Sequence, residues 1–289
     1  MSRATLALAA AIAVCALASP VAAQTRLRWS DDWQRVHPAS YVATTTSVAA
    51  AIFVDQLYEP PEGTLWRGPI LFDRDVRASL MAAEDPDREV AATLSDVLLG
   101  ALLVWPALDA WGVVGLGDWN SDVFWQLTNI ALEVVAADFA LGTLIKLFTD
   151  RERPHGDRCS EGSPHGRFDR CGRRGISRSF YSGHASAAFA SAGNVCMSHA
   201  YLPIYGGAAQ DALACGGAVL LASIVGVLRV IADRHYGTDV LIGAAVGLAT
   251  GLALPYLLHY GWHPGPEIVS GTAPLSATTP VMLSWGGRF

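Results

Sequence analysis

Charged residues are scarce in this chain, and lysine is almost absent. Only 16% of the 289 residues are Asp, Glu, Lys or Arg, whereas typical soluble domains contain roughly 25%. The single lysine is Lys146, and the formal net charge is −6. A protein that binds nucleic acid needs a basic surface, so this balance argues against a nucleic-acid partner. The hydrophobic share of 52% and the mean hydropathy of +0.31 favour membrane association instead.

The chain also lacks the alternation of apolar and polar residues that marks a half-buried β-strand. Its apolar segments have helical length and are separated by Gly, Pro and Asp residues. They run over about 94–116, 123–148, 184–204, 212–232 and 239–260. The sequence therefore predicts an all-α fold, a helical bundle of about five or six core helices that spans a membrane.

Segments of different composition flank these helices. Residues 1–23 combine a positive Arg3, an apolar stretch and a small-residue cleavage site, the pattern of a signal peptide or of an uncleaved anchor. Residues 24–93 are mixed, and we interpret them as an irregular N-terminal region with some helices, on the periplasmic side. The helical core is expected over 94–262, and an extended tail over 263–289.

Cysteine is rare, with five residues in the whole chain. Export implies an oxidising compartment, so Cys159 and Cys171, which flank a polar loop, are predicted to form a disulfide. His155 and His165 leave a Cys/His metal site as an alternative, but the spacing matches no zinc pattern. The other two cysteines beyond the signal, interpreted as core residues, are Cys196 and Cys215.

Acidic residues inside the apolar segments bear on the membrane prediction. Asp109, Glu133 and Asp138 all lie within such segments. Charges are costly in lipid unless they face the protein interior. A soluble exported protein therefore remains open as an alternative.

The last apolar segment favours the membrane. Val240 to Leu258 is uncharged and near the length needed to cross a bilayer. Gly243, Gly247 and Gly251 recur every four residues along it. They predict a smooth helix face that permits close packing against a neighbouring helix.

Two cations lie at the end of the second apolar segment. Lys146 and Arg153 are seven residues apart, which is about two helical turns, so they share one face while the helix lasts. Pro154 marks the end of regular helix. Such a pair can hold a phosphate dianion, with the arginine offering two parallel N–H donors.

A second stretch directly precedes the segment 184–204. Backbone N–H groups at a helix N-terminus bind anions, and Gly183 lets the main chain approach a ligand closely. Ser182 can donate its hydroxyl to a phosphate oxygen. His184 lies where it could protonate a leaving alkoxide as a general acid.

The third stretch combines a cation, an imidazole and a carboxylate. His235 and Asp239 are four residues apart, so they are expected to be neighbours on one helix face or across a turn. A carboxylate there can fix the imidazole tautomer while the other ring nitrogen attacks phosphorus. Arg229 would add a third cation to the two of the first stretch.

Together the three stretches resemble the signature of the phosphatidic acid phosphatase type 2/haloperoxidase superfamily. That signature reads K-x6-R-P, P-S-G-H and S-R-x5-H-x3-D, and the chain reads KLFTDRERP, SFYSGH and LRVIADRHYGTD in the same order. The chain departs from it at Tyr181, where the family has proline, and at Leu228, where the family has serine. Neither position carries a principal catalytic group.

The resemblance implies a phosphatase that forms a phosphohistidine, with the active site at one end of the bundle. His235 would be the nucleophile, Asp239 its orienting partner, and His184 the general acid and then the base. The phosphoryl oxygens would be bound by Lys146, Arg153, Ser182, Gly183 and Arg229. No metal and no cofactor are expected, because cations and backbone amides neutralise the charge of the transition state.

The expected substrate is a lipid phosphate, such as phosphatidate or an isoprenyl or glycerolipid phosphate, or another phosphomonoester. All three stretches must share one face of the bundle, which after export should be periplasmic. This orientation requires residues 94–116 to cross the membrane inwards and residues 123–148 to cross it outwards. It also requires that residues 41–54 do not cross the membrane. We therefore expect a bacterial inner-membrane protein with a site that faces the periplasm.

Two alternative functions stay open at this point. One is a soluble periplasmic acid phosphatase with broad specificity and the same site. The other is a vanadium-dependent haloperoxidase, since vanadate mimics the phosphoryl transition state in the same pocket. Such enzymes are generally larger than this chain.

Overall fold

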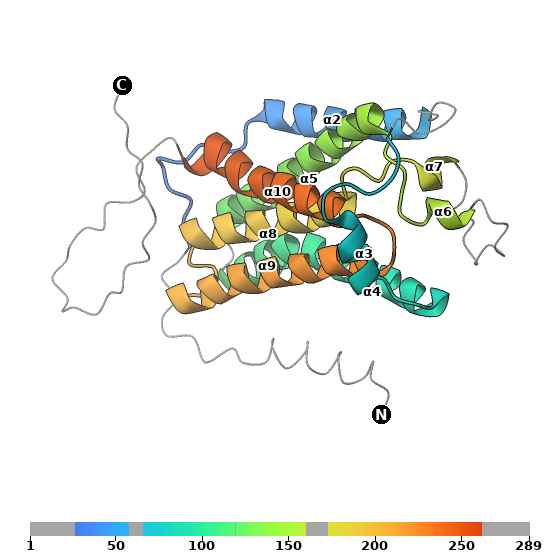
Figure 1. The fold of residues 1–289 in the computed structure, drawn as a ribbon. Helices are drawn as coiled ribbons and strands as arrows, with labels where there is room; N and C mark the ends of the chain where they lie inside the picture. The colour runs from blue at the N-terminus through green and yellow to red at the C-terminus, as the bar shows by residue number, and fades with distance from the viewer. Residues whose placement is uncertain (1–26, 58–65, 119, 160–172, 262–289) are drawn as a thin grey trace, which may run out of the picture.

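The computed structural model of the chain describes four stretches, residues 27–57, 66–118, 120–159 and 173–261. These residues form an all-α bundle (Figure 1), and within them no β-strand is present. The predicted all-α class is therefore confirmed. The expected signal peptide (1–23) and tail (263–289) lie outside the described residues, so both stay predictions.

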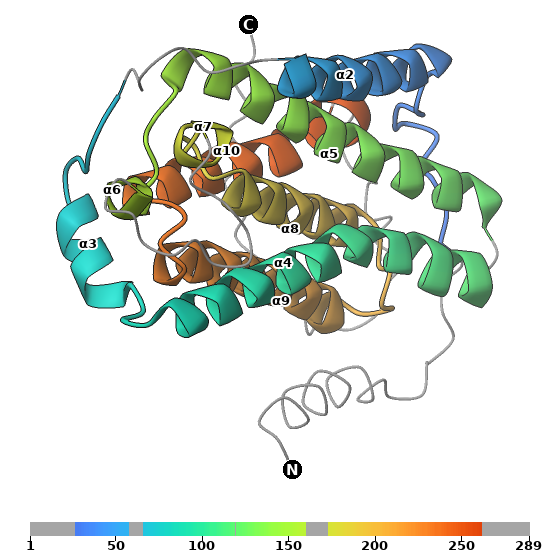
Figure 2. The ribbon, with the colours of Figure 1, turned by 90° about the vertical axis from the view of Figure 1, so that its right-hand side faces the viewer.

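Five helices of the described chain form the bundle, and α8 lies at its centre. They are α4 (Asp85–Leu108), α5 (Ser121–Thr149), α8 (Gly183–Tyr201), α9 (Ala208–Ile231) and α10 (Gly237–Pro255). The helices α4, α5, α9 and α10 all pack against α8 and surround it (Figure 2). Their number and order agree with the five apolar segments of the sequence.

Shorter elements cover the outside and one end of the bundle. Helix α2 (Pro38–Leu57) packs along α5, and α3 (Asp73–Leu80) contacts α9 and α10. Two one-turn helices, α6 (Gly156–Cys159) and α7 (Arg173–Ile176), lie at the same end of the bundle as α3 (Figure 1). At this end α5 finishes, and α8 and α10 begin.

The first bundle helix starts earlier than the expected boundary at residue 94. Helix α4 begins at Asp85, with Pro86 in its first turn. Acidic residues in that turn, Asp85 and Asp87, complement the positive end of the helix dipole. The early turns are charged rather than apolar, so hydrophobic periodicity misses them. After α4 the chain continues in π-helical geometry over Asp109–Asp118.

Residues before α2 pack into the bundle core. Trp29 and Trp33 are 3% and 5% exposed, and their rings meet edge to face. Both rings contact Tyr260, which follows α10. Tyr260 stacks on Tyr201, the last residue of α8. This aromatic cluster attaches the N-terminal segment to the end of the bundle opposite α3.

Three glycines of α10 bring that helix into contact with the backbone of α8. The three contacts are Gly243 with Ser182, Gly247 with Ser186, and Gly251 with Ala190. A Cβ atom built at any of these glycines would lie within 2.6 Å of the paired carbonyl oxygen. Because no side chain fits there, the close packing that the glycine spacing predicts is confirmed.

Replacing Gly247 with alanine is expected to destabilise the protein, because the new methyl group would overlap the Ser186 carbonyl oxygen. Overpacking of this kind costs about 1–3 kcal/mol or more. The loss is measured as a lower unfolding temperature in detergent.

The matched control is Gly216→Ala on the exposed face of α9, where nothing lies within 4 Å of an added Cβ. Alanine is the better helix former by about 1 kcal/mol, so this variant should be as stable as the parent or slightly more so. If Gly247→Ala unfolds at the same temperature as the control, the contact between α8 and α10 is not as described.

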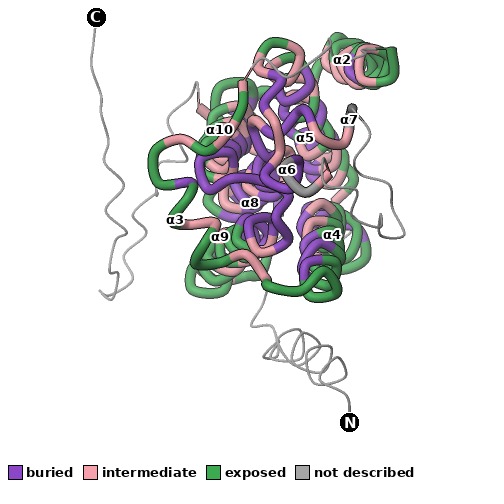
Figure 3. Tube along the Cα trace, turned by 45° about the vertical axis from the view of Figure 1, so that its right-hand side comes forward, coloured by how far each residue is buried: buried purple, intermediate pink, exposed green. Residues whose placement is uncertain are grey.

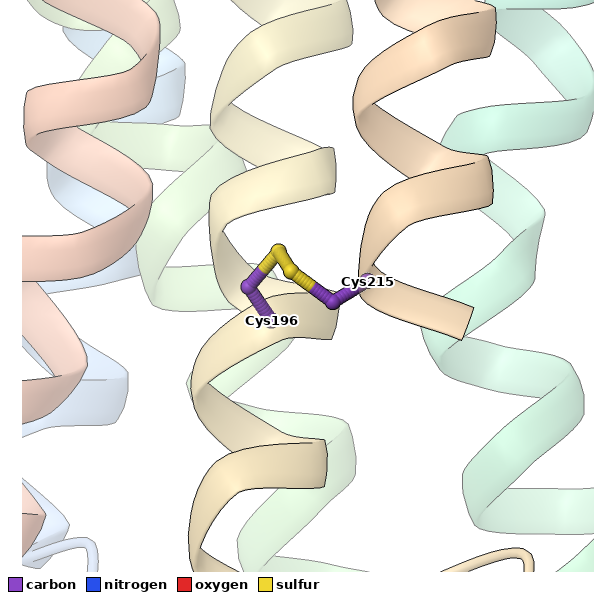
Figure 4. The surroundings of a disulfide bond; sticks show 2 residues. All are labelled: Cys196 and Cys215. Atoms are coloured by element: carbon purple, nitrogen blue, oxygen red, sulfur yellow. A yellow bond between two sulfur atoms is a disulfide. The ribbon is translucent and has the colours of Figure 1, made fainter. Parts of the chain in front are cut away.

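Cys196 of α8 and Cys215 of α9 are joined by a disulfide bond (Figure 4). Their Cα atoms lie 4.4 Å apart. The interpretation of these two cysteines as plain core residues is therefore wrong. The sequence conceals the pair, because 19 positions separate the cysteines and both lie in apolar helices. The predicted Cys159–Cys171 bridge stays a prediction, since Cys171 lies outside the described residues.

The outer faces of the bundle, seen as exposed in Figure 3, carry many large apolar side chains. Examples on α4, α5, α9 and α10 are Val97, Val104, Trp125, Phe139, Leu213, Leu220 and Leu241. In the part of the chain that the structure describes, three helical stretches are long and apolar enough to cross a membrane, namely Asp85–Gly117, Ala208–Ile231 and Gly237–Tyr260. Helix α2, which contains the segment 41–54, is not one of the three.

The acidic residues of the apolar segments point inwards. Asp109, Glu133 and Asp138 are only 3%, 7% and 4% exposed. Each has a partner inside the bundle: Tyr205 donates to Asp109 (2.6 Å), Nε2 of His259 lies 2.8 Å from Glu133, and the Ser186 hydroxyl donates to Asp138. These charges therefore meet the condition under which a membrane tolerates them.

Candidate active site

The three signature stretches meet at the end of the bundle where α5 finishes and α8 and α10 begin. The Ser182 N–H donates to the carbonyl oxygen of Asp239 at 3.0 Å, which joins the second stretch to the third. A Cβ atom built on Gly183 would lie 2.9 Å from Nζ of Lys146, which joins the second stretch to the first. The structure thus brings the predicted residues to one place.

A cavity of about 370 Å³ opens beside Lys146 and Arg153. Lys146 lies in the last turn of α5, but Arg153 lies beyond the helix, which ends at Thr149. Shared helix spacing is therefore not what brings the two cations together. Asp150 takes a left-handed conformation (φ 30°) and turns the chain, and the Arg153 N–H then donates to the carbonyl oxygen of Ile176 at 2.7 Å.

The second stretch forms the beginning of α8. Ser182 is the N-cap residue, and its hydroxyl oxygen accepts a hydrogen bond from the N–H of Ala185 at 3.4 Å. Gly183 lines the cavity next to Lys146. The N–H groups in the first turn of a helix have no partner within the helix, so they provide donors for an anion at this end.

A carboxylate that the sequence analysis did not single out holds His184 and Arg229. Oδ1 of Asp96, on α4, lies 2.8 Å from Nε2 of His184 and 3.2 Å from Nη1 of Arg229. Arg229 also donates to the hydroxyl of Ser95 at 3.0 Å. The Asp96 side chain is 55% exposed, so it lies at the mouth of the site. Nδ1 is then the nitrogen of His184 left to exchange a proton with a ligand.

His235 lies in the loop between α9 and α10 and is 2% exposed. Its Nδ1 lies 2.9 Å from the carbonyl oxygen of Ser179. A carbonyl oxygen only accepts hydrogen bonds, so Nδ1 carries the proton and Nε2 keeps its lone pair. Burial and the positive charges of Arg153 and Arg229 lower the pKa of His235 well below its ordinary value. The imidazole is therefore neutral at neutral pH, as a nucleophile must be.

Asp239 does not make the direct hydrogen bond to His235 that the sequence predicts. Its Oδ2 lies 3.9 Å from Nδ1 of the imidazole, beyond hydrogen-bond distance. The carboxylate instead accepts hydrogen bonds from the Ser179 hydroxyl (2.6 Å), the Tyr236 N–H (2.9 Å) and Arg151 (2.5 Å). The four-residue spacing rule holds within a helix, but His235 precedes the start of α10.

Arg151 is a fully buried cation that connects the site to the N-terminal region. It is 0% exposed, and its two terminal nitrogens lie 2.7 Å from Asp73 of α3 and 2.5 Å from Asp239. The guanidinium carbon lies 4.2 Å from the ring centre of Trp66 and 4.4 Å from that of Tyr236. Two carboxylates and two aromatic faces thus stabilise the guanidinium charge of Arg151, which is buried away from water.

Ser179 completes a closed set of hydrogen bonds around His235. Its N–H donates to the carbonyl oxygen of Arg151 at 2.8 Å, and its own carbonyl accepts from His235. Its hydroxyl bonds to Asp239, which Arg151 holds from the other side. Asp239 therefore acts on His235 through Ser179. The sequence analysis missed both Arg151 and Ser179, although both lie within the quoted stretches.

Within the described residues, no three His, Cys, Asp or Glu side chains gather as metal ligands do. The alternative Cys/His metal site would need His165 and Cys171, which lie outside the described residues. The positive charge at the site comes from the side chains of Lys146, Arg153 and Arg229.

Fold and site together define a helical-bundle protein whose candidate site combines lysine, arginine and histidine side chains. Residues 127–262 match the family model of the PAP2 superfamily, and this range contains all three signature stretches. This match agrees with the resemblance that the signature predicts. No curated protein matches it significantly.

One solved structure to which the chain shows similarity is a transmembrane PAP2-type phosphatidylglycerolphosphate phosphatase from Bacillus subtilis. The two chains are 19% identical, and the TM-score is 0.46. The alignment covers 76% of this chain and 94% of the other.

Replacing Arg151 with methionine is expected to destabilise the protein strongly, because Asp73 and Asp239 would keep buried charges without their cation. Breaking a buried ion pair costs about 3–5 kcal/mol. The matched control is Arg35→Met, which removes a 2.9 Å ion pair to Asp122 whose side chains are 47% and 41% exposed. Exposed pairs contribute about 0–1 kcal/mol. Equal changes in unfolding free energy for the two variants would contradict the role assigned to Arg151.

Proposed function

We propose that this protein is a metal-independent phosphatase that hydrolyses lipid phosphate monoesters through a phosphohistidine at His235. The observation that carries the proposal is the state of His235, which is neutral and keeps its lone pair on Nε2. Three cations lie around it, from Lys146, Arg153 and Arg229. The match of residues 127–262 to the family model of the PAP2 superfamily supports the same reaction class.

In the first step, Nε2 of His235 attacks phosphorus, and the bond between phosphorus and the ester oxygen breaks. His184 donates a proton to the leaving oxygen, so the alcohol departs uncharged. Lys146, Arg153 and Arg229, with the first-turn amides of α8, balance the charge on the phosphoryl oxygens. The backbone carbonyl on Nδ1 supports the positive charge that the imidazole gains.

In the second step, His184 accepts a proton from water, and the resulting hydroxide attacks phosphorus. The bond between phosphorus and Nε2 of His235 breaks, which releases inorganic phosphate and restores the nucleophile. Asp96 contacts Nε2 of His184 and stabilises the imidazolium whenever that ring is protonated. The two steps therefore return every proton to its starting place.

The surroundings of the cavity support a lipid substrate. Beyond Lys146 and Arg153 it is lined by the apolar side chains of Leu103, Val135 and Phe139. A phosphate at the cations would place an alkyl chain along these side chains. The large apolar residues exposed on the bundle surface argue against the soluble phosphatase. We place the site on the periplasmic side of a bacterial inner membrane, on the strength of the signal-like N-terminus.

Replacing His235 with alanine is expected to lower phosphate release from phosphatidate micelles by at least about a thousandfold, because the nucleophile is lost. The assay contains EDTA throughout, and the parent protein should stay active in it. The matched control is His37→Ala, an exposed histidine just before α2, which should keep full activity.

Near-normal activity in a folded His235→Ala protein would show that His235 is not the nucleophile. Loss of parent activity in EDTA, restored by magnesium or zinc, would contradict the metal-free mechanism. Bromide oxidation with added vanadate tests the haloperoxidase alternative in the same preparation.

A further inference from the structure

A phenol and a carboxylate that the proposed mechanism leaves unused face the same cavity. Tyr181 stands where the family signature has proline, directly before Ser182. Asp138 lies on α5, two helical turns before Lys146. Both side chains line the cavity of about 370 Å³ that also reaches Lys146 and Arg153. They are therefore next to the expected phosphate position.

The phenol oxygen of Tyr181 lies against Gly142, which stands between Asp138 and Lys146 along α5. A Cβ atom built on Gly142 would be 3.5 Å from the Tyr181 hydroxyl oxygen. Asp138, Gly142 and Lys146 follow one another at intervals of four residues on α5, so they lie on one face of that helix. The absence of a side chain at Gly142 gives the tyrosine ring room between its two charged neighbours.

The Tyr181 hydroxyl is buried and has no well-formed hydrogen bond to the protein. The residue is 1% exposed, and no described group makes a hydrogen bond of good geometry with its hydroxyl. Ser186 lies nearby, but its own hydroxyl donates to Asp138. Buried hydroxyls are seldom left unpaired, because the loss of water is then uncompensated.

The protonation state of the phenol makes it a donor. Burial, and then the negative charge of Asp138, raise the pKa of Tyr181 to about 12. The phenol therefore keeps its proton throughout the neutral range. A donor and an acceptor that lie side by side match a hydroxyl group, which can accept one hydrogen bond and donate another.

We propose that Tyr181 and Asp138 form a subsite for a free hydroxyl on the alcohol portion of the substrate, close to its phosphate ester. The phenol donates to the oxygen of this hydroxyl, and the carboxylate accepts its hydrogen. A cationic group fits less well, because Lys146, Arg153 and Arg178 border the same cavity. The proposal rests on the proposed function, since it takes the phosphate to lie at the cations.

The substrate class that follows is a phosphate monoester of an apolar alcohol with a neighbouring free hydroxyl. A monoacylated glycerol phosphate has this chemistry. An ester without the hydroxyl would leave both polar groups of the subsite without this partner, and such a loss weakens transition-state binding.

The test compares kcat/KM for two matched esters in detergent micelles. One is a 1-acyl-glycerol 3-phosphate, and the other is the same acyl ester of propane-1,3-diol phosphate, which lacks only the 2-hydroxyl. The parent protein is expected to favour the hydroxylated ester by about tenfold. Tyr181→Phe and Asp138→Ala should lose this preference, while Tyr181→Phe hydrolyses the deoxy ester as well as the parent does.

The matched control is Tyr260→Phe, which removes a buried hydroxyl that also has no hydrogen bond of good geometry among the described residues but lies at the opposite end of the bundle. This variant should keep the preference. Equal kcat/KM values for the two esters in the parent protein would overturn the subsite, as would a preference that survives in Tyr181→Phe or an equal loss on both esters. Failure of the parent to hydrolyse either ester would instead overturn the proposed function.

Discussion

The buried contact between Arg151 and Asp239 is the interaction on which the site depends. Asp239 also accepts the Tyr236 N–H and so caps α10, which means that one carboxylate sets both the helix start and the loop that carries His235. Arg151 gains a second carboxylate from Asp73 of α3, so the N-terminal region is part of this network. A buried charge cluster of this kind is stable only when each member keeps its partners. The loop that carries His235 is therefore held by the same buried contacts that join α3 to α10.

Helix packing supplies the other constraint, because it decides where the second stretch lies. The glycines of α10 allow its backbone to touch that of α8, and the first of these contacts is between Gly243 and Ser182. The N-terminus of α8 is thereby held beside the start of α10, with the Ser182 N–H on the carbonyl oxygen of Asp239. A larger residue at these glycine positions would separate the first-turn amides of α8 from His235. The small residues of α10 thus help to set the geometry of the candidate site.

Much of the fold follows from the sequence, because five apolar segments separated by turn residues allow little besides a helical bundle. The signature also predicts which stretches meet, and the structure brings them together. Helical spacing gives a wrong prediction for residues that lie outside a helix. Arg153 follows the end of α5, and His235 precedes the start of α10, so neither shares a helix face with its expected neighbour. The role of Arg151 could not be predicted, since its partner Asp73 is 78 positions away. Tyr181 is visible in the sequence as a departure from the family, but its meaning emerges only with the cavity beside it.

The most direct test of this account is to stop the reaction with alkali during turnover of a radiolabelled lipid phosphate and to map the labelled peptide by mass spectrometry. Phosphohistidine survives alkali, whereas a phosphoryl group on a carboxylate does not. The account predicts one phosphoryl group on Nε2 of His235, formed as the alcohol is released and lost as inorganic phosphate appears. A phosphoryl group on any other residue, or turnover without a phosphorylated protein at any time point, would contradict it.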